Sequence, residues 1–201
     1  MNIIKYFINI LLLVYVNESW ARLSNEIENC KRCMLYKTRN NVVIYSGKIG
    51  APIMFIGEAP GKEEDLAGKP FVGRAGKTLN QKIDSLNIAG KYIIVNVLKC
   101  KPINNVYKKK YEKACVPYLF KQIELSSPKL IITLGRNAWK LFSTMPLTQM
   151  VGKPITIENA TFFPMFHPAA ILHDPRKRDI WERSWVALKK YIENEPQLSN
   201  P

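Results

Sequence analysis

The stretch Ala51-Pro52-Ile53-Met54-Phe55-Ile56-Gly57 is a short apolar run that ends in glycine. Similar apolar runs occupy residues 92–98, 130–134 and 161–166. Helical segments are expected between and after these runs, at about residues 75–86, 111–125, 136 onward and 179–192. Apolar strands that alternate with helices are typical of a mostly parallel sheet covered by helices on both faces. The sequence therefore predicts a protein of the α/β class.

Polar residues and turn residues stand where each predicted strand ends. Ligands of open parallel sheets bind beyond the carboxyl ends of the strands, so these residues are candidates for one shared site. They are the segment 57–61 (Gly-Glu-Ala-Pro-Gly), Asn96, Cys100, Gly135 and His167-Pro168. Taken singly, each has a structural alternative: a turn, a capping side chain or a buried histidine.

Length and charge narrow the class of protein further. The chain has 201 residues, which fits one domain of about 100–200 residues, and its 47% of hydrophobic residues excludes a disordered tail. It carries 30 Lys and Arg against 16 Asp and Glu, a net charge of +14. Such an excess favours a polyanion such as nucleic acid as partner, because clustered cations release counterions from phosphates. The alternative is an unspecialised basic surface.

The four cysteines are candidates for a shared ligand site. Cys30 and Cys33 form a C-x-x-C pair, and Cys100 and Cys115 lie far downstream. Four thiolates complete either a zinc tetrahedron or an iron–sulfur cluster, and spacing does not choose between the two. Buried thiols, or two disulfides in an exported protein, are the alternatives.

The N-terminus raises the question of export. Lys5 precedes an apolar stretch at residues 6–16, and Ser19-Trp20-Ala21 loosely resembles a small-residue cleavage site. A thiolate site fits poorly with an oxidising compartment, so we disfavour a signal peptide and expect a cytoplasmic protein. Residues 1–25 are then an N-terminal apolar helix or extension, with residues 1–16 attached and partly buried. A mature chain beginning at Arg22 and an internal start near Asn17 are the alternatives.

Three ordered motifs resemble those of the family 4 uracil-DNA glycosylases. Residues 57–65 (Gly-Glu-Ala-Pro-Gly-Lys-Glu-Glu-Asp) with residues 68–76 (Gly-Lys-Pro-Phe-Val-Gly-Arg-Ala-Gly) resemble the first motif of that family. Residues 96–102 (Asn-Val-Leu-Lys-Cys-Lys-Pro) resemble the second, and residues 167–172 (His-Pro-Ala-Ala-Ile-Leu) resemble its His-Pro-Ser/Ala motif. The resemblance covers about residues 26–192.

This resemblance implies a fold, an activity and a cofactor. The fold is a three-layer α/β/α sandwich with a central four-stranded parallel sheet, and the domain spans residues 26–195, with a tail at 196–201. The activity is hydrolytic removal of uracil from DNA. The cofactor is a structural 4Fe-4S cluster held by the four cysteines, which are Cys30, Cys33, Cys100 and Cys115.

The resemblance also assigns roles in the active site. The residues that bind the substrate are Gly57, Ala59, Phe71 and Asn96. Phe71 stacks on the flipped base, and the amide of Asn96 matches the imide edge of uracil, whereas cytosine presents the opposite pattern. His167 donates a hydrogen bond to the uracil carbonyl as negative charge develops.

The water-activating residue is less clearly defined. Better-known glycosylases of the wider superfamily carry an aspartate at the position where this chain has Ala59. Glu58 or Glu64 must then share the electrostatic and water-positioning work. An additional interpretation of Glu64 is that it excludes the methyl group of thymine.

DNA contacts are expected on two segments. Residues 99–113 hold six Lys against one Glu, among them Lys108, Lys109 and Lys110, and a solvated face beside the thiolates is the alternative. Beyond His167, Ile171 and Leu172 look like exposed aliphatic residues that enter the base stack, with Arg176 nearby to hold phosphates. The expected partner is uracil-containing DNA, single- or double-stranded. The protein is expected to be a monomer and to bind no membrane.

Two rival functions remain open. A related branch of the superfamily binds uracil-DNA covalently through a basic, His-containing insert, and residues 101–114 contain no His. The other rival is a non-catalytic nucleic-acid-binding module of the same fold, which would release no uracil.

Overall fold

A six-stranded sheet forms the centre of the computed structural model, which describes residues 3–199 except for the side chains of residues 3–10, 13 and 199. Four strands form its parallel middle, in the order β3 (Tyr92–Asn96), β2 (Ile53–Gly57), β4 (Leu130–Leu134) and β6 (Ala160–Met165). Two short antiparallel strands, β1 (Ser46–Gly47) and β5 (Ile155–Ile157), close its edges. The predicted α/β fold with four parallel strands is confirmed, and the two edge strands were missed.

Burial explains why the sequence predicts the middle strands and not the edges. Every residue of β2 and β4 is buried, because helices cover both faces of the sheet, so these strands are continuous apolar runs. The edge strands have two and three residues of mixed exposure, and such short segments carry no periodic signal.

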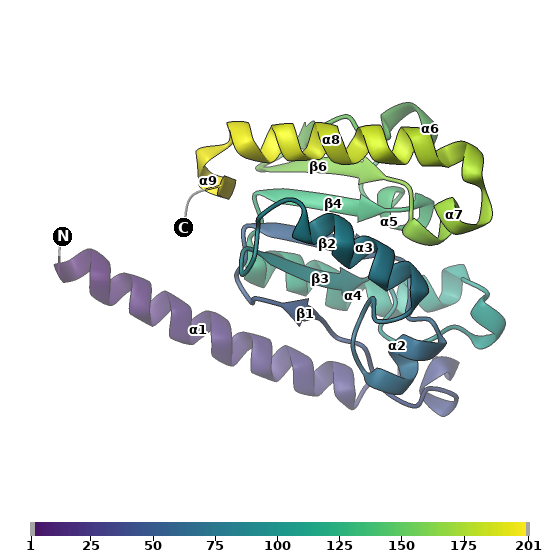
Figure 1. Ribbon diagram of the computed structural model, residues 1–201. Coiled ribbons are helices and arrows are strands. Elements are labelled where there is room, and N and C mark those ends of the chain that lie inside the picture. The colour runs from purple at the N-terminus through teal and green to yellow at the C-terminus, as the bar shows by residue number, and fades with distance from the viewer. Residues whose placement is uncertain (1–2, 200–201) are drawn as a thin grey trace.

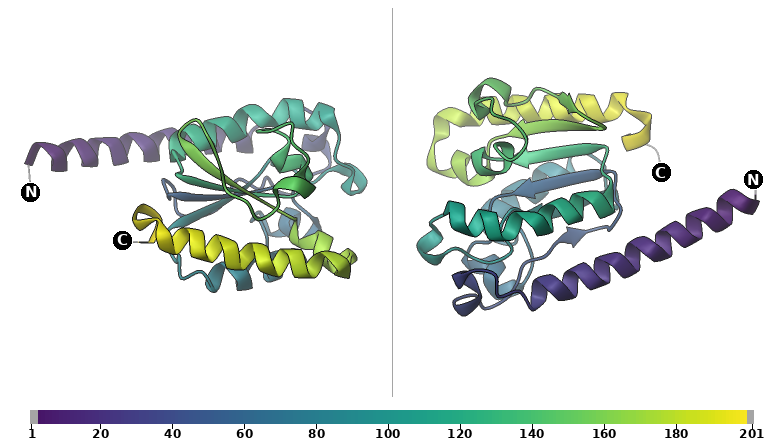
Figure 2. Two further views of the ribbon diagram at one scale, coloured as in Figure 1. Left: turned by 90° about the horizontal axis from the view of Figure 1, so that it is seen from above. Right: turned by 180° about the vertical axis from the view of Figure 1, so that it is seen from behind.

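Helices form the two outer layers (Figure 1). On one face lie α3 (Arg74–Asp84) and α8 (Arg178–Asn194), and on the other lies α4 (Lys109–Ser126) (Figure 2). These three agree with the predicted helices to within a few residues. The helix expected from residue 136 is much shorter: α5 covers Arg136–Trp139, and a second short helix, α6, covers Leu147–Met150.

The first helix, α1 (Ile3–Glu28), packs against α4 only along its second half. Figures 1 and 2 show its N-terminal half running away from the rest of the protein. Trp20, Leu23 and Ile27 are buried, whereas Leu11 and Tyr15 are 68% and 63% exposed. The expectation of a helix is correct, but the described side chains at residues 11–15 are not buried as expected. Within residues 3–199, no helix is long and apolar enough to span a membrane.

The remaining helices gather near the carboxyl ends of the parallel strands (Figure 1). They are α2 (Lys62–Ala67), α7 (Pro168–His173) and α5, and each follows the strand that precedes it within a few residues. Short 3₁₀ turns at Met34–Lys37, Ile103–Asn105 and Pro175–Lys177 complete the loops, and α9 (Pro196–Ser199) follows α8. The candidate residues that follow the four parallel strands therefore lie at one edge of the molecule, the active-site rim.

Candidate active site

A pocket of about 440 Å³ opens at this rim, within the range of about 300–1,000 Å³ typical of small-ligand sites. Residues from three of the predicted motifs line it together. They include Ala59, Glu64, Phe71, Asn96, His167 and Leu172, joined by Asn105 and His173. The structure thus brings together side chains that lie more than 100 residues apart in the chain.

Phe71 forms one wall of the pocket from an unusual backbone conformation. Its φ angle is +55°, in the left-handed region that non-glycine residues seldom adopt. The carbonyl of Phe71 accepts a hydrogen bond from Asn80 Nδ2 at 3.2 Å, and a Cβ at Gly76 would lie 2.0 Å from that carbonyl. Helix α3 can therefore approach the loop closely only because residue 76 is glycine, and the contact holds the Phe71 ring in the pocket.

Asn96 ends β3 directly beside Gly57, which ends β2. Its side chain is almost fully buried, and its Oδ1 atom has no hydrogen-bond partner. A Cβ at position 57 would lie 2.3 Å from that oxygen and 2.7 Å from the Phe71 ring. Buried acceptors are normally satisfied, so an unpaired oxygen on a pocket wall indicates a ligand that donates to it.

His167 faces Phe71 across the pocket, with the two ring centroids 5.6 Å apart. Its Nδ1 accepts a hydrogen bond from the Ala169 N–H at 3.2 Å, as the cap of α7. A neutral imidazole with an accepting Nδ1 carries its proton on Nε2. Burial lowers the pKa of His167 to about 4, so the ring is neutral near pH 7 and presents one N–H donor.

The two candidate carboxylates have different surroundings. Glu64 is buried, and its carboxylate accepts hydrogen bonds from the N–H groups of Gly61 at 3.0 Å and Gly73 at 2.8 Å. It therefore ties together the two halves of the first motif. Glu58 lies just outside the pocket lining and accepts a hydrogen bond from Asn137 Nδ2 at 2.7 Å.

The expected DNA contacts need two corrections. Ile171, expected to be exposed, is only 5% exposed and belongs to the core, because it lies on the inner face of α7. Lys99, counted within the basic run, is 1% exposed and cannot reach a phosphate. Leu172 does line the pocket, and Lys108, Lys109 and Lys110 are exposed. Arg176 is exposed as well and forms an ion pair with Asp174.

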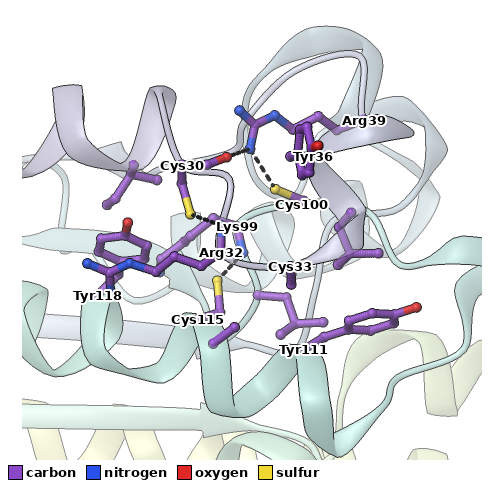
Figure 3. A pocket seen from close by; sticks show the side chains of 14 residues that line it. Cys30, Arg32, Cys33, Tyr36, Arg39, Lys99, Cys100, Tyr111, Cys115 and Tyr118 are labelled. Carbon is purple, nitrogen blue, oxygen red and sulfur yellow. Dashed lines mark hydrogen bonds between the residues drawn. The ribbon is translucent and has the colours of Figure 1, made fainter.

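The four cysteines line one common pocket between the end of α1, the segment after β3 and α4. Figure 3 shows Cys30, Cys100 and Cys115 around the same space, with Cys33 beside them. N–H groups point at three of the sulfurs: Arg32 N at Cys30 (3.5 Å), Arg39 Nη1 at Cys100 (3.4 Å) and Lys99 N at Cys115 (3.2 Å). Such donors stabilise sulfur that carries negative charge, as metal-bound thiolates do.

The donor set fits a metal centre built on sulfur. Burial raises the pKa of Cys115 to about 11 and also raises the pKa of Cys100, so both are protonated thiols without a metal. Binding would release their protons. Among the described residues, no three His, Cys, Asp or Glu side chains are grouped closely enough to hold one metal ion. Four thiols around one pocket fit a cluster, in which each thiolate binds a different iron.

Several residues of these sites escaped the sequence-based analysis. Asn137 and Arg39 reach their partners across 79 and 61 residues, and no local pattern signals such a contact. Asn105 was noted only as part of the basic run, although its φ of +56° indicates a special turn. His173 is the last residue of α7, six residues beyond His167, a spacing that gives no same-face helical signal.

The fold and this pocket define a class of protein. The family model for the uracil DNA glycosylase superfamily matches residues 44–189, most of the chain. The chain therefore belongs to that superfamily and has its α/β/α fold.

The relatives identify the branch as family 4. The type-4 uracil-DNA glycosylases of Sulfurisphaera tokodaii and Saccharolobus solfataricus are each 40% identical to this chain, covering 86% and 87% of it and 84% and 87% of their own lengths. The type-4 uracil-DNA glycosylase of Archaeoglobus fulgidus is 37% identical, over 85% of this chain and 92% of its own. The resemblance found in the motifs is thus confirmed over most of the chain.

Proposed function

We propose that this protein is a DNA-repair glycosylase that flips uracil out of DNA and hydrolyses its N-glycosidic bond, leaving an abasic site. The family and its relatives support this activity. The observation that carries the proposal is the unpaired, buried Oδ1 of Asn96 in a pocket shared with Phe71 and His167. A flipped base is read by hydrogen bonds to its edge and by stacking, and this pocket offers both.

Recognition rests on the amide of Asn96. Its oxygen accepts the imide N–H of uracil, and its NH₂ group donates to the adjacent carbonyl. Cytosine has its acceptor where uracil has a donor, and its donor where uracil has an acceptor. It would therefore leave the buried oxygen of Asn96 unpaired, and a site built to form that hydrogen bond rejects such a base strongly. Phe71 replaces part of the stacking that the base loses on leaving the duplex.

Catalysis consists mainly of stabilising separated charges. When the bond between the uracil nitrogen and C1′ breaks, its electron pair leaves with uracil, and C1′ becomes an oxocarbenium-like cation. The Nε2–H of His167 donates to the uracil carbonyl oxygen on which negative charge develops. Water then adds to C1′ and gives its proton to a nearby carboxylate. Because His167 is neutral, it acts as a hydrogen-bond donor and not as a positive charge.

The carboxylates divide this work. Glu58 keeps one oxygen engaged by Asn137, which fixes its orientation, and we assign it the positioning of water and the stabilisation of the cation. Glu64 uses its oxygens to hold Gly61 and Gly73, so its role is to shape the loop that carries Phe71. In this position it also narrows the pocket that excludes the methyl group of thymine.

DNA is held by the basic surface around the rim. A second pocket shares His167 and carries Arg136, Lys140 and Lys177, next to the exposed lysines of residues 108–110. These cations suit the phosphates on either side of a flipped nucleotide, and Leu172 suits the space that the base vacates. The protein acts as a monomer, on single- or double-stranded DNA, in the cytoplasm with the nucleoid.

Cys30, Cys33, Cys100 and Cys115 hold a 4Fe-4S cluster in this proposal. A bound cluster supplies a structural cross-link between the end of α1 and the segments around α4. Anaerobically purified protein is expected to be brown, with about four iron per chain. Colourless protein with one zinc per chain would contradict the cluster. Cys100→Ala should lower both iron content and thermal stability, because it unties two distant segments.

Uracil release is tested directly. Purified protein is incubated with single- and double-stranded oligonucleotides that hold one uracil, and alkali-labile abasic sites are measured. Strand cleavage after alkali, with free uracil released, is the expected result. Binding without release would favour the non-catalytic rival, and a stable protein–DNA adduct would favour the covalent one.

A further inference from the structure

Lys99 lines the thiol pocket (Figure 3), and its ammonium group bonds to Asn96, which lines the candidate uracil pocket. Its side chain is 1% exposed, although lysine is almost never fully buried unless it is paired. The partners of its ammonium group are two neutral oxygens. Nζ donates to the main-chain carbonyl of Asn96 and to Oε1 of Gln122, each at 2.5 Å. Taking a cation out of water is costly, so bonds of this kind indicate a specific purpose.

The partner at the far end is itself held firmly. Gln122 is fully buried in α4, and its Nε2 donates to the carbonyl of Ile44 at 3.2 Å. This bond turns Oε1 of Gln122 toward Lys99. The ammonium is therefore anchored to the layer of α4 and to the segment before β1, both outside the active-site rim.

The partner at the near end is the residue that reads the base. Asn96 is the last residue of β3, and its Oδ1 fits against Gly57 so closely that a Cβ there would lie 2.3 Å away. The main-chain carbonyl of Asn96 stands at this strand end, where it accepts the bond from Lys99 Nζ. The bond from Lys99 fixes the strand end from which the amide projects.

We infer that Lys99 is a positioning residue that holds the amide of Asn96 in the orientation that accepts uracil, an inference that rests on the proposed function. The main chain of Lys99 serves the same end. Its N–H donates to Cys115 Sγ at 3.2 Å, and its carbonyl accepts from the Val43 N–H at 2.8 Å. Lys99 thus contacts both sites: its main-chain N–H bonds to Cys115 of the thiol site, and its side-chain ammonium bonds to Asn96.

The test is Lys99→Met, which keeps the length of the side chain and removes the ammonium. Single-turnover excision of uracil should fall about 10- to 100-fold, because a misplacement of about 1 Å in an active site costs up to about 100-fold. Affinity for DNA that holds an uncleavable uracil analogue in place of the target should change less than about twofold, since a buried residue reaches no phosphate.

A double-mutant cycle separates positioning from general destabilisation. In an Asn96→Ala background, Lys99→Met should reduce the excision rate by less than about twofold, because the amide that it positions is already absent. A purely structural role would reduce the rate by the same factor in both backgrounds. Gln122→Leu is the matched control: it keeps the bond from Lys99 to Asn96 and should cost clearly less than Lys99→Met.

Folding of each variant is verified by iron content per chain and by thermal unfolding. If Lys99→Met does not fold, Lys99→Met with Gln122→Leu replaces it, because removing both polar partners together costs less than orphaning one. The inference is overturned if folded Lys99→Met protein excises uracil at the wild-type rate. It is also overturned if Lys99→Met lowers the excision rate by the same factor in the wild-type and Asn96→Ala backgrounds. Wild-type protein that binds but does not release uracil contradicts the proposed function instead.

Discussion

The side-chain amide of Asn137 donates a hydrogen bond to the carboxylate of Glu58 over 2.7 Å. Asn137 belongs to α5, which follows β4, and Glu58 follows β2, the neighbouring strand in the sheet. The pairing of two parallel strands thus brings an amide to a carboxylate 79 residues earlier. This bond fixes one carboxylate oxygen of Glu58, the residue to which we assign the positioning of water.

Asn137→Ala should slow single-turnover excision about tenfold, because a hydrogen bond to a charged group is worth about 1.5–3 kcal/mol. Glu58→Gln should slow it more, since it removes the charge as well as the orientation. Both variants are compared with wild type under enzyme excess, with unfolding temperature as the control for folding. An Asn137→Ala enzyme as fast as wild type would show that Glu58 needs no such support.

Asn96→Asp should relax the exclusion of cytosine. A carboxylate has no NH₂ donor for the uracil carbonyl and accepts from the exocyclic amine of cytosine instead. The ratio of excision rates on matched uracil and cytosine oligonucleotides is expected to fall by about 10-fold or more, the size of one hydrogen bond to a charged group. An unchanged ratio would mean that another residue reads the base.

The low pKa of His167 predicts the pH dependence of both rate and stability. His167→Ala should slow excision by about 100-fold or more, as loss of one oxyanion donor does. In wild type, the ring stays neutral down to about pH 4, so its titration should not lower the rate between pH 8 and pH 5. A loss of activity centred near the ordinary histidine pKa of about 6.5 would contradict a buried, neutral His167.

The corresponding effect on stability has a definite sign. Below about pH 6.5 the unfolded chain takes up a proton on this residue, whereas the folded protein does so only near pH 4. The stability that depends on neutral His167 is therefore present above pH 6.5 and is lost as the pH falls to about 4. The difference in unfolding free energy between wild type and His167→Gln should change over this window.

Gly57→Ala should abolish most excision without unfolding the protein. The added methyl group would lie 2.3 Å from Asn96 Oδ1 and 2.7 Å from the Phe71 ring, so it displaces both groups that meet the base. We expect a loss of at least about 100-fold in single-turnover rate, comparable to a misplacement of about 1 Å. Gly90→Ala is the control, because no atom lies within 4 Å of its added methyl and only its positive φ is strained. Equal activity of the two variants would disprove the close packing around residue 57.

A chain that starts at Asn17 should excise uracil as fast as the full chain and unfold at nearly the same temperature. Among the side chains of α1 that the structure describes, those at residues 11, 12, 14 and 15 are exposed, and the first fully buried one is Trp20. A chain that starts at Asn25 also lacks Trp20 and Leu23, and should lose at least about 3–5 kcal/mol of stability, the cost of one large core side chain. If the shorter deletion alone destabilised the protein, the apolar first half of α1 would have a partner within the fold. N-terminal sequencing of protein from its native cells shows which start is used.

The sequence by itself determined the fold class, the family and the main candidate residues of the site. Four buried apolar runs predict the parallel strands, because strands covered on both faces must be apolar throughout. Three ordered motifs identify the branch and select Phe71, and the rule that ligands bind beyond the carboxyl ends of strands predicts Asn96 and His167 on one edge. All of this information is local in the chain.

Only the tertiary structure decided how those residues are held and which of them are accessible. Glu58 and Asn137, Lys99 and Gln122, and Glu64 and Gly73 meet through strand pairing and loop packing, which no local pattern encodes. The same holds for burial: an aliphatic residue after a motif and a lysine in a basic run look exposed in sequence. In the fold, Ile171 and Lys99 lie inside, because the direction of a side chain depends on what packs against its element.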